Sequence, residues 1–349
     1  MTILWIPHSP FQPGSVRRDQ HLIRHLKDRH RIISVTWEAG NESLLKAFRE
    51  GMRFYKFSLE DGRIAYHVRR VPDVTRRLRR NKRRAMRLNE IMFQRDIRQI
   101  VKEEKVDVLV AAYSEFMTGT PPFDVNIPVV FDYLDCADWT KRFPREREYI
   151  RKADLVVAVS KLAEEQARQL NERTVFIPNG ADIGRLKSAS GQLVCEKYDL
   201  SSARVVSLIG LMDSDYLVEA VLQARDEIED LKCLLVGKSE ALEKEIDNLP
   251  ASQSDAFVYV GPVPHSMVAG FFAATDVGLY PVPGLPYDDG RSPIKVFEYL
   301  AANKPVVSPP IKEVKRLGFK NIVYSNPEAK SFASGIVQAL NKETSDEPK

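Results

Sequence analysis

The stretch Arg291-Ser-Pro-Ile-Lys-Val-Phe-Glu-Tyr-Leu-Ala301 contains a clear helix start, and the fold can be worked out from it in both directions. Ser292 is a good N-cap residue, and Pro293 suits the first helical position because a backbone N–H has no partner there. The helix leads into Pro305–Ser308, an apolar run typical of a buried strand. A helix followed directly by a buried strand is typical of an α/β domain.

Charged side chains gather around this predicted helix start. The unpaired N–H groups of a first helical turn and the helix dipole favour an anion such as phosphate, and Arg291 and Lys295 add positive charge beside them. Glu298 lies roughly one and a half turns further on. Its carboxylate could accept hydrogen bonds from two neighbouring hydroxyl groups. The alternative is a capped surface helix on which Lys295 and Glu298 form an ordinary i, i+3 ion pair.

Apolar runs alternate with helical patterns along the whole chain. In the first half, the runs typical of strands are Ile3–Ile6, Ile32–Trp37, Val106–Ala112, Val129–Asp132, Leu155–Ser160 and Thr174–Pro178. In the second half they are Arg204–Ile209, Lys232–Gly237, Phe257–Val260, Val277–Pro281, Pro305–Ser308 and Asn321–Tyr324. Strands that alternate with helices predict α/β domains built on parallel sheets.

The alternation is interrupted once, after Asn179-Gly-Ala-Asp182. Residues 184–203 contain Gly, Ser and charged residues without a clear period, which indicates a hinge. We therefore expect a Rossmann-like domain over residues 1–185, a linker over 186–203 and a second Rossmann-like domain over 204–349, whose last helix could pack back on the first domain. Ligands of open α/β sheets bind at the carboxyl ends of the strands, so we expect the site in a cleft between two facing domains.

The composition is that of a globular protein. The chain has 349 residues, of which 44% are hydrophobic and 29% charged, and this excludes a disordered chain. No stretch approaches the ~20 apolar residues of a membrane-spanning helix, and the apolar N-terminus is too short for a signal peptide. The three cysteines are far apart, which favours a reducing compartment. We expect a cytoplasmic protein without a metal or other cofactor.

Several motifs together resemble a known family. Ser292-Pro-x-Lys-x-x-Glu-Tyr-Leu-Ala301, followed by Pro305-Val-Val, resembles the donor motif of GT-B glycosyltransferases. The nearest group is the family 4-like "glycosyl transferases group one" class, in the branch that includes teichuronic-acid and exopolysaccharide enzymes. Further elements resemble that class in the same order, namely Ala153–Ser160, Ile177–Asp182, Leu234–Gly237, Val260–Pro264 and Asp276–Pro281. Together they cover roughly residues 129–340.

The resemblance implies a site for a nucleoside diphosphate sugar, linked to UDP or GDP. Glu298 would hold the ribose, and the residues from Ser292 to Lys295 would meet the diphosphate. The turn at Gly210-Leu211 would approach the diphosphate closely, because a glycine lets the backbone come near a ligand. The implied donor-binding residues are Gly210, Leu211, Lys238, Val260, Gly261, Tyr280, Arg291, Ser292, Pro293, Ile294, Lys295 and Glu298. Lys238 could equally be a solvated side chain.

Two features depart from the family pattern. Many members have a glutamate, seven residues and a second glutamate, but here the first position is Gly290, with Asp288 and Asp289 beside it. The Arg and Lys that usually follow the first strand of the second domain are also absent, and Leu211–Tyr216 stands in their place. Arg291 and Lys295 are therefore expected to supply the positive charge that binds the phosphates. The stereochemistry, retaining or inverting, stays open.

Catalytic candidates lie in the N-terminal half, close to predicted strand ends. Asp135 and Asp138 belong to the acidic segment after the strand that ends at Asp132. A carboxylate there could be the general base of an inverting enzyme, or it could cap the next helix. His8 lies in the loop after the first strand, and it is either a catalytic candidate or a loop histidine without chemistry.

Acceptor-binding candidates lie in the same half. Arg17 and Arg18 belong to a segment that resembles the opening of these enzymes and could touch a phosphate of the acceptor or donor. Tyr113 and Glu115 end another predicted strand and would face the same region. Acceptor pockets of such proteins lie in variable loops, so the acceptor itself is not predicted.

A strongly basic segment spans residues 69–88. From Arg69 to Arg87 ten residues are Lys or Arg, and only Asp73 is acidic. Such a run can bind an anionic membrane surface with ~1 kcal/mol per basic residue near the lipid. Nucleic acid is a rival partner, but the segment lacks interleaved aromatic residues, so none is expected. A solvated loop without a partner is the third alternative.

These observations predict a GT-B glycosyltransferase, peripheral on the inner face of the cell membrane. It would move a sugar from a nucleotide sugar to a glycan or lipid-linked acceptor in polysaccharide synthesis, without a metal ion. Two alternatives from other classes remain. One is a nucleotide-sugar epimerase on the same fold, and the other is a non-catalytic, membrane-bound sensor of nucleotide sugars.

Overall fold

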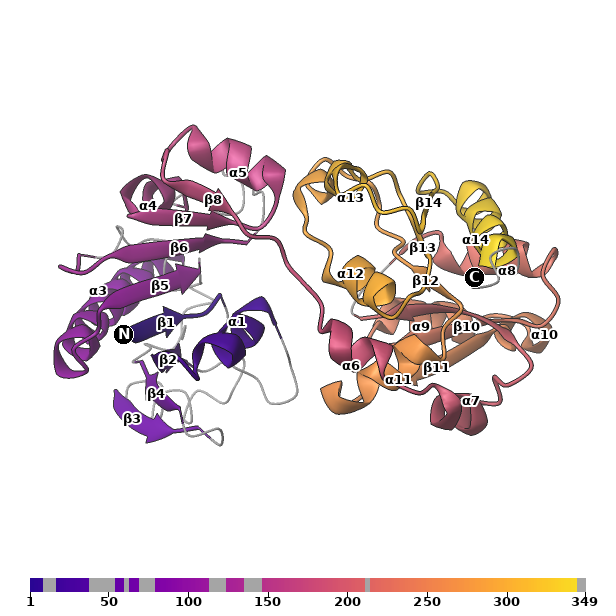
Figure 1. Ribbon diagram of the computed structural model, residues 1–349, viewed down its shortest axis with the longest axis horizontal. Helices are drawn as coiled ribbons and strands as arrows, with labels where there is room; N and C mark the ends of the chain where they lie inside the picture. Colours follow the sequence, from indigo (N-terminus) through magenta and orange to yellow (C-terminus); the bar gives the residue numbers. More distant parts are fainter. Residues whose placement is uncertain are drawn as a thin grey trace. The chain divides into compact units, whose positions relative to one another are not determined.

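The computed structural model describes residues 1–8, 17–37, 54–59, 63–68, 79–112, 124–134, 146–210 and 214–343, with the backbone but not the side chains of 79–87 and 343. The chain divides into two compact units, Met1–Pro178 and Asn179–Lys349 (Figure 1). Each unit contains a largely parallel sheet with helices packed on it. The predicted α/β class is therefore confirmed.

The first unit contains an eight-stranded sheet with the strand order β3-β4-β2-β1-β5-β6-β7-β8. Its strands are β1 (Thr2–Ile6), β2 (Arg31–Thr36), β3 (Tyr55–Ser58), β4 (Ile64–His67), β5 (Val108–Ala112), β6 (Val129–Tyr133), β7 (Leu155–Ala158) and β8 (Thr174–Phe176). All pairs are parallel except β3 with β4. Six of these strands were predicted from their apolar runs. The antiparallel pair β3–β4 was missed because its residues are mixed in polarity.

Helices cover this sheet on both sides. They are α1 (Arg18–Leu26), α3 (Arg79–Glu103), α4 (Glu146–Lys152) and α5 (Lys161–Arg168). The strand β1 is buried on both faces, because Leu4 and Ile6 belong to the main core whereas Ile3 and Trp5 pack with Ile23 of α1. Burial on both faces explains the continuous apolar runs seen in the sequence.

The second unit contains a six-stranded, fully parallel sheet with the order β11-β10-β9-β12-β13-β14. Its strands are β9 (Arg204–Ile209), β10 (Leu231–Val236), β11 (Phe257–Gly261), β12 (Val277–Leu279), β13 (Val306–Ser308) and β14 (Ile322–Tyr324). The helices are α6 (Ile183–Lys187), α7 (Gln192–Tyr198), α8 (Leu217–Arg225), α9 (Glu240–Asp247), α10 (Ala251–Ser254), α11 (Val268–Ala273), α12 (Ile294–Ala301), α13 (Lys312–Arg316) and α14 (Ala329–Glu343), with 3₁₀ turns η2 (His265–Met267) and η3 (Asp288–Gly290).

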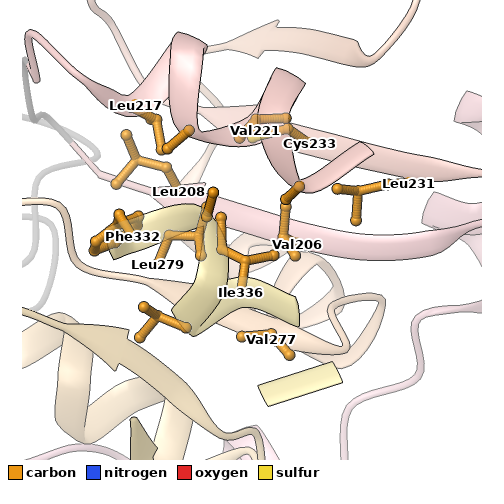
Figure 2. Close-up of a cluster of buried hydrophobic side chains, with 14 of the residues drawn as sticks. Val206, Leu208, Leu217, Val221, Leu231, Cys233, Val277, Leu279, Phe332 and Ile336 are labelled. Carbon is orange, nitrogen blue, oxygen red and sulfur yellow. The ribbon is translucent and has the colours of Figure 1, made fainter. Parts of the chain in front are cut away.

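The stretch 186–203 and the last helix both pack into this second unit. The stretch 186–203, expected to be a linker, contains α7, and its Leu186, Val194 and Leu200 are buried in a core that also contains Phe272. The last helix, α14, packs against α8 and β13. Figure 2 shows Phe332 of α14 in the buried cluster with residues of β9 and β12.

The buried carboxylate of Glu104 binds side chains from strands at one edge of the first sheet. The Glu104 carboxylate, whose side chain is 6% exposed, lies at the end of α3 and accepts hydrogen bonds from Lys56 Nζ and Tyr66 Oη, each 2.5 Å long. It also forms an ion pair with Arg31 at the start of β2. Burial alone would raise the pKa of Glu104, but the hydrogen bonds from Lys56, Tyr66 and Arg31 lower it to about 2.

This cluster predicts acid sensitivity of the first unit. The folded pKa of Glu104 lies below its usual 4.5, so its contribution to stability is present above pH 4.5 and is lost as the pH falls toward 2. We expect that Glu104→Gln removes up to about 3 kcal/mol at pH 7 and makes unfolding less pH-dependent between pH 4.5 and 2. The three tryptophans, Trp5, Trp37 and Trp139, all lie in the first unit, so their fluorescence during urea unfolding reports on it. Equal pH slopes for both proteins would contradict the prediction.

Candidate functional site

The strand order of the second sheet marks a place for a ligand. The first strand of this unit, β9, is followed by β10 and β11 on one side, and the chain then returns to β12 on the other side. The chain thus leads from β9 to β10 on one side and from β12 to β13 on the other, and ligands of open parallel sheets bind at the carboxyl ends of the strands at such a switch point. The loop after β12 continues to α12, so the predicted motif begins at this point.

Three glycines end the three adjacent strands β9, β10 and β11. Gly210, Gly237 and Gly261 have φ values of +133°, +135° and +73°. The Gly210 N–H donates to Val236 O at 2.7 Å, and a Cβ on Gly237 would lie only 2.2 Å from the carbonyl oxygen of Gly210. A side chain is excluded at Gly237 and none is present at Gly210, so the backbone at the ends of β9 and β10 can approach a ligand there. The backbone at Gly210 is therefore compatible with the predicted close approach to a ligand. Leu211, the other residue of that predicted turn, lies outside the described residues.

The helix α12 begins one residue later than expected. Its first residue is Ile294, and Pro293 occupies the N-cap position without a capping side chain. Ser292 was predicted to be the N-cap, and this is wrong because its hydroxyl instead accepts the N–H of Asn179 at 3.0 Å. The N–H groups of the first turn have no intrahelical acceptor by position, and the N-cap residue Pro293 makes no side-chain hydrogen bond to them. They are suited to an anion.

Lys295 and Glu298 form the charged pair of this helix. Lys295 Nζ lies 2.7 Å from Glu298 Oε2, and the two side chains are 29% and 13% exposed. The lysine ammonium also lies 5.6 Å from the Phe272 ring centroid, and its stem lies against Gly210, where an added Cβ would be 3.0 Å from Lys295 Cε. The pair is therefore largely buried over the end of β9, which makes it unlike an ordinary surface pair.

The segment before α12 contains the acids that flank Gly290. Asp288 is 1% exposed, and its Oδ2 accepts the Leu285 N–H at 2.9 Å. Its Oδ1 lies 3.2 Å from Arg291 Nε without hydrogen-bond geometry. Asp289 instead receives the N–H and the ammonium of Lys312, at 3.1 and 2.9 Å. Both carboxylates thus lie within ion-pair distance of a basic side chain, Asp288 of Arg291 and Asp289 of Lys312.

Arg291 is held in a defined position. Its guanidinium carbon lies 4.8 Å from the Tyr287 ring centroid, in addition to the contact with Asp288. The side chain as a whole remains 38% exposed, three residues before α12 begins. A positioned guanidinium on a partly exposed side chain is suited to phosphate or carboxylate.

Tyr299 fixes α12 to the end of β9. Its ring is fully buried edge-on against Phe272, with centroids 4.8 Å apart. Its hydroxyl donates to Ser207 O at 2.8 Å and accepts the Ile209 N–H at 3.0 Å, one residue before Gly210. One side chain therefore sets the distance between the helix and the glycine turn.

We expect Tyr299→Phe to destabilise the second unit by roughly 1–3 kcal/mol, because the buried Ile209 N–H loses its acceptor. Thermal unfolding followed by far-ultraviolet circular dichroism measures the change. Tyr324→Phe is the matched control, since Tyr324 is 38% exposed and should be nearly neutral. Equal stability of the Tyr299→Phe variant and the wild type would show that the hydroxyl does not hold this contact.

Other predicted donor residues lie around the same sheet edge. Lys238 follows Gly237 but is exposed, and its Nζ pairs with Glu240 Oε1 at 2.8 Å. Val260 is partly buried at the end of β11, next to Gly261. Tyr280 directly follows β12 and is 4% exposed.

A second group of charged residues lies at the carboxyl ends of the strands of the first sheet. Arg18 is 9% exposed, and its Nε lies 3.2 Å from Asp132 Oδ1 at the end of β6. Burial raises the pKa of Asp132 to about 6, although Arg18 opposes the shift. Arg17 is exposed before α1, and its N–H donates to Gln20 Oε1 at 3.2 Å. His8 is exposed after β1. The remaining candidates, Tyr113, Glu115, Asp135 and Asp138, lie outside the described residues.

Comparisons with known proteins agree with this geometry. The family model described as "Glycosyltransferase Family 4" matches residues 14–185, and that described as "Glycosyl transferases group 1" matches residues 204–342. The chain belongs to these glycosyltransferases. No curated protein matches the sequence.

Solved structures place this glycosyltransferase in the GT-B fold. Sucrose-phosphate synthase from Thermosynechococcus elongatus has a TM-score of 0.66 at 14% identity, covering 98% of this chain and 90% of that one. The apo structure of OtsA has a TM-score of 0.69 at 13% identity, with 99% and 94% covered. Anabaena HepE in complex with UDP and glucose has a TM-score of 0.62 at 16% identity, with 99% and 91% covered.

Two residues of this glycosyltransferase were given no role from its sequence. Asn179 lies in the Ile177–Asp182 element, and its side chain reaches Ser292 across a long sequence separation. Tyr299 lies inside the donor motif, and only its hydrogen bonds to β9 show what it does. The only sign of these roles in the sequence was that both residues lie inside the family motifs. Neither the asparagine nor the tyrosine is required there by the local secondary structure.

Proposed function

We propose that this glycosyltransferase takes its sugar from a nucleoside diphosphate sugar bound at the start of α12. The observation that carries the proposal is the convergence of three features: the uncapped helix start, the glycine-lined ends of β9 and β10, and the buried Lys295–Glu298 pair. A structure of HepE, which shares the fold, contains UDP and glucose. UDP or GDP is therefore the expected carrier.

The chemistry follows from the charges around α12. As the bond between the sugar C1 and the diphosphate oxygen breaks, negative charge grows on the diphosphate. The first-turn N–H groups, Lys295 and Arg291 would stabilise that charge without a metal ion. Glu298 would turn from Lys295 to the two ribose hydroxyls, which releases the ammonium toward the diphosphate.

The acceptor is proposed to be a glycan or a lipid-linked sugar, as in polysaccharide synthesis. An acceptor hydroxyl would bond to C1 and lose its proton to a base, for which Asp135, Asp138 and His8 are the candidates. Arg17, Arg18, Tyr113 and Glu115 remain candidates for acceptor binding. Arg18 is already engaged with Asp132, so it would act there mainly by shaping the strand ends.

A thermal-shift screen of nucleotide sugars tests the proposal. Free donor at 100 times its Kd should stabilise the protein by about 2.7 kcal/mol. A donor that is bound and consumed only with an acceptor supports the transferase. Formation of an epimer without any acceptor would favour the epimerase, and tight binding of an unchanged donor across a broad acceptor panel would favour the sensor.

We further propose that the first unit binds an anionic membrane surface through residues 69–88 and the exposed side of α3. Leu88 and Ile91 are 47% and 58% exposed, and Arg95, Arg98 and Lys102 follow at helical spacing on the exposed side. None of the helices in the described residues is long and apolar enough to cross a membrane. Electrostatic attraction with shallow insertion of two aliphatic side chains fits this surface.

Flotation with liposomes tests the membrane proposal. We expect the protein to float with anionic vesicles at low salt, and to be released as salt rises, because the Debye length falls from about 30 Å at 0.01 M to about 8 Å at 0.15 M. Ile91→Glu with Arg95→Glu should weaken flotation. Lys315→Glu with Arg316→Glu, two basic residues on α13 of the second unit, is the control. Absence of flotation at low salt would remove the membrane proposal.

A further inference from the structure

The chain passes from the first unit to the second between Pro178 and Asn179. On the first side, the carbonyl oxygens of the last two residues accept hydrogen bonds from one buried guanidinium. Arg18 Nη2 donates to Ile177 O at 2.9 Å and Arg18 Nη1 to Pro178 O at 3.0 Å. The same guanidinium is held by Asp132 through Nε. The end of the first unit is thus fixed by a buried ion pair.

On the second side, Asn179 is bound to the segment that precedes α12. The Asn179 N–H donates to Ser292 Oγ at 3.0 Å, and Asn179 Nδ2 donates to Ser292 O at 2.7 Å. Ser292 is 9% exposed and is followed directly by Pro293, the N-cap of α12. Asn179 therefore binds both the hydroxyl and the carbonyl oxygen of Ser292, which lies two positions before the helix.

The bond to the Ser292 carbonyl fixes a peptide plane. Because Pro293 has no N–H, the plane between Ser292 and Pro293 can be held through this carbonyl oxygen but not through a donor of its own. Pro293 O accepts the first helical hydrogen bond, from Phe297 N at 3.3 Å. A rotation of this peptide plane would tilt the first turn of α12 and re-aim its N–H groups.

We propose that Asn179 is a positioning residue for the donor site. Through Ser292 it sets the orientation of the first turn of α12. The direction of the N–H groups that would face the phosphate then depends on Asn179, the residue at which the second unit begins. This inference rests on the proposed function, because it assumes that the diphosphate meets that turn. Asn179 itself would neither contact the donor nor take part in bond breaking. Displacements of about 1 Å at such a site are enough to reduce binding and rate strongly.

The test compares Asn179→Ala with a matched asparagine variant. Asn171 Nδ2 likewise donates to main-chain oxygens, Ile150 O at 2.8 Å and Ala153 O at 2.7 Å, but within the first unit. Asn179→Ala loses the bond from Nδ2 to Ser292 O, whereas Asn171→Ala loses both of these bonds and the one that its Oδ1 accepts from the Arg173 N–H, so the control is the harsher test of folding. We expect Asn179→Ala to raise the Kd for UDP or GDP at least tenfold in calorimetry. Asn171→Ala should lower the Tm at least as much as Asn179→Ala does and leave that Kd within twofold of the wild type.

Asn179→Gln is the second variant, which keeps an amide but places it one methylene further out. We expect it to fold and to raise the Kd between the wild-type and Asn179→Ala values. Lys295→Ala separates this inference from the proposed function. If the wild type binds neither UDP nor GDP, both the function and the inference fail. If Lys295→Ala raises the Kd while Asn179→Ala and Asn179→Gln bind as the wild type does, only the positioning role is overturned.

Discussion

Replacing Glu298 by alanine should weaken binding of the nucleotide sugar at least a hundredfold. The carboxylate is proposed to accept hydrogen bonds from two ribose hydroxyls, and bonds to a charged acceptor contribute about 1.5–3 kcal/mol each. Isothermal calorimetry with the nucleotide selected by the screen measures the loss. The fold should survive, because the Lys295 side chain that loses its partner is 29% exposed and can be solvated, and α12 is held by Tyr299.

Glu219→Ala is the control for this variant. Glu219 lies on α8 of the same unit, is exposed, and accepts a hydrogen bond from Gln223 at 2.9 Å. Its removal should leave the affinity unchanged. If Glu298→Ala binds the donor as tightly as the wild type, the ribose role of Glu298 is wrong, although the phosphate role of the helix start would still stand.

The largest effect on stability is expected from Gly278→Ala. A Cβ on Gly278 in β12 would lie 2.3 Å from Tyr299 Cγ and 2.5 Å from both Cδ atoms. The ring cannot move away, because it is fully buried and its hydroxyl is bound to β9. We expect a loss of more than about 3 kcal/mol, or failure of the second unit to fold. Circular dichroism during thermal unfolding measures this.

The chain offers two internal controls for that experiment. Gly184→Ala, in α6, would place its Cβ no closer than 3.9 Å to another atom and should be neutral or slightly stabilising. Tryptophan fluorescence, which reports on the first unit, should change little in either variant. Equal unfolding temperatures for Gly278→Ala and the wild type would contradict the packing of Tyr299 on β12.

The architecture was predictable because both sheets are buried on two faces. Strands such as β1 and β9 are continuous apolar runs, and such runs can be recognised without knowledge of tertiary contacts. The pair β3–β4 lies at a sheet edge with polar and aromatic residues mixed, so no period identified it. The stretch 186–203 contains so many small and charged residues that the buried Val194 and Leu200 could not be recognised as a packed face.

The candidate site was predictable as a motif but not as a set of contacts. The positions of Lys295 and Glu298 follow from helical spacing. The partner of Ser292 does not, because Asn179 lies far away in the sequence and only the fold brings it near. For the same reason, the sequence showed two acids beside Gly290 without showing that they lie beside Arg291 and Lys312.

A crystal structure of the protein with UDP or GDP, whichever the screen selects, tests the central claim most directly. The predicted result places the diphosphate within hydrogen-bond distance of the first-turn N–H groups of α12 and near Lys295 Nζ, with the ribose hydroxyls on Glu298 and the backbone of Gly210 alongside. A nucleotide bound elsewhere on the chain, with the Lys295–Glu298 pair intact, would contradict the account.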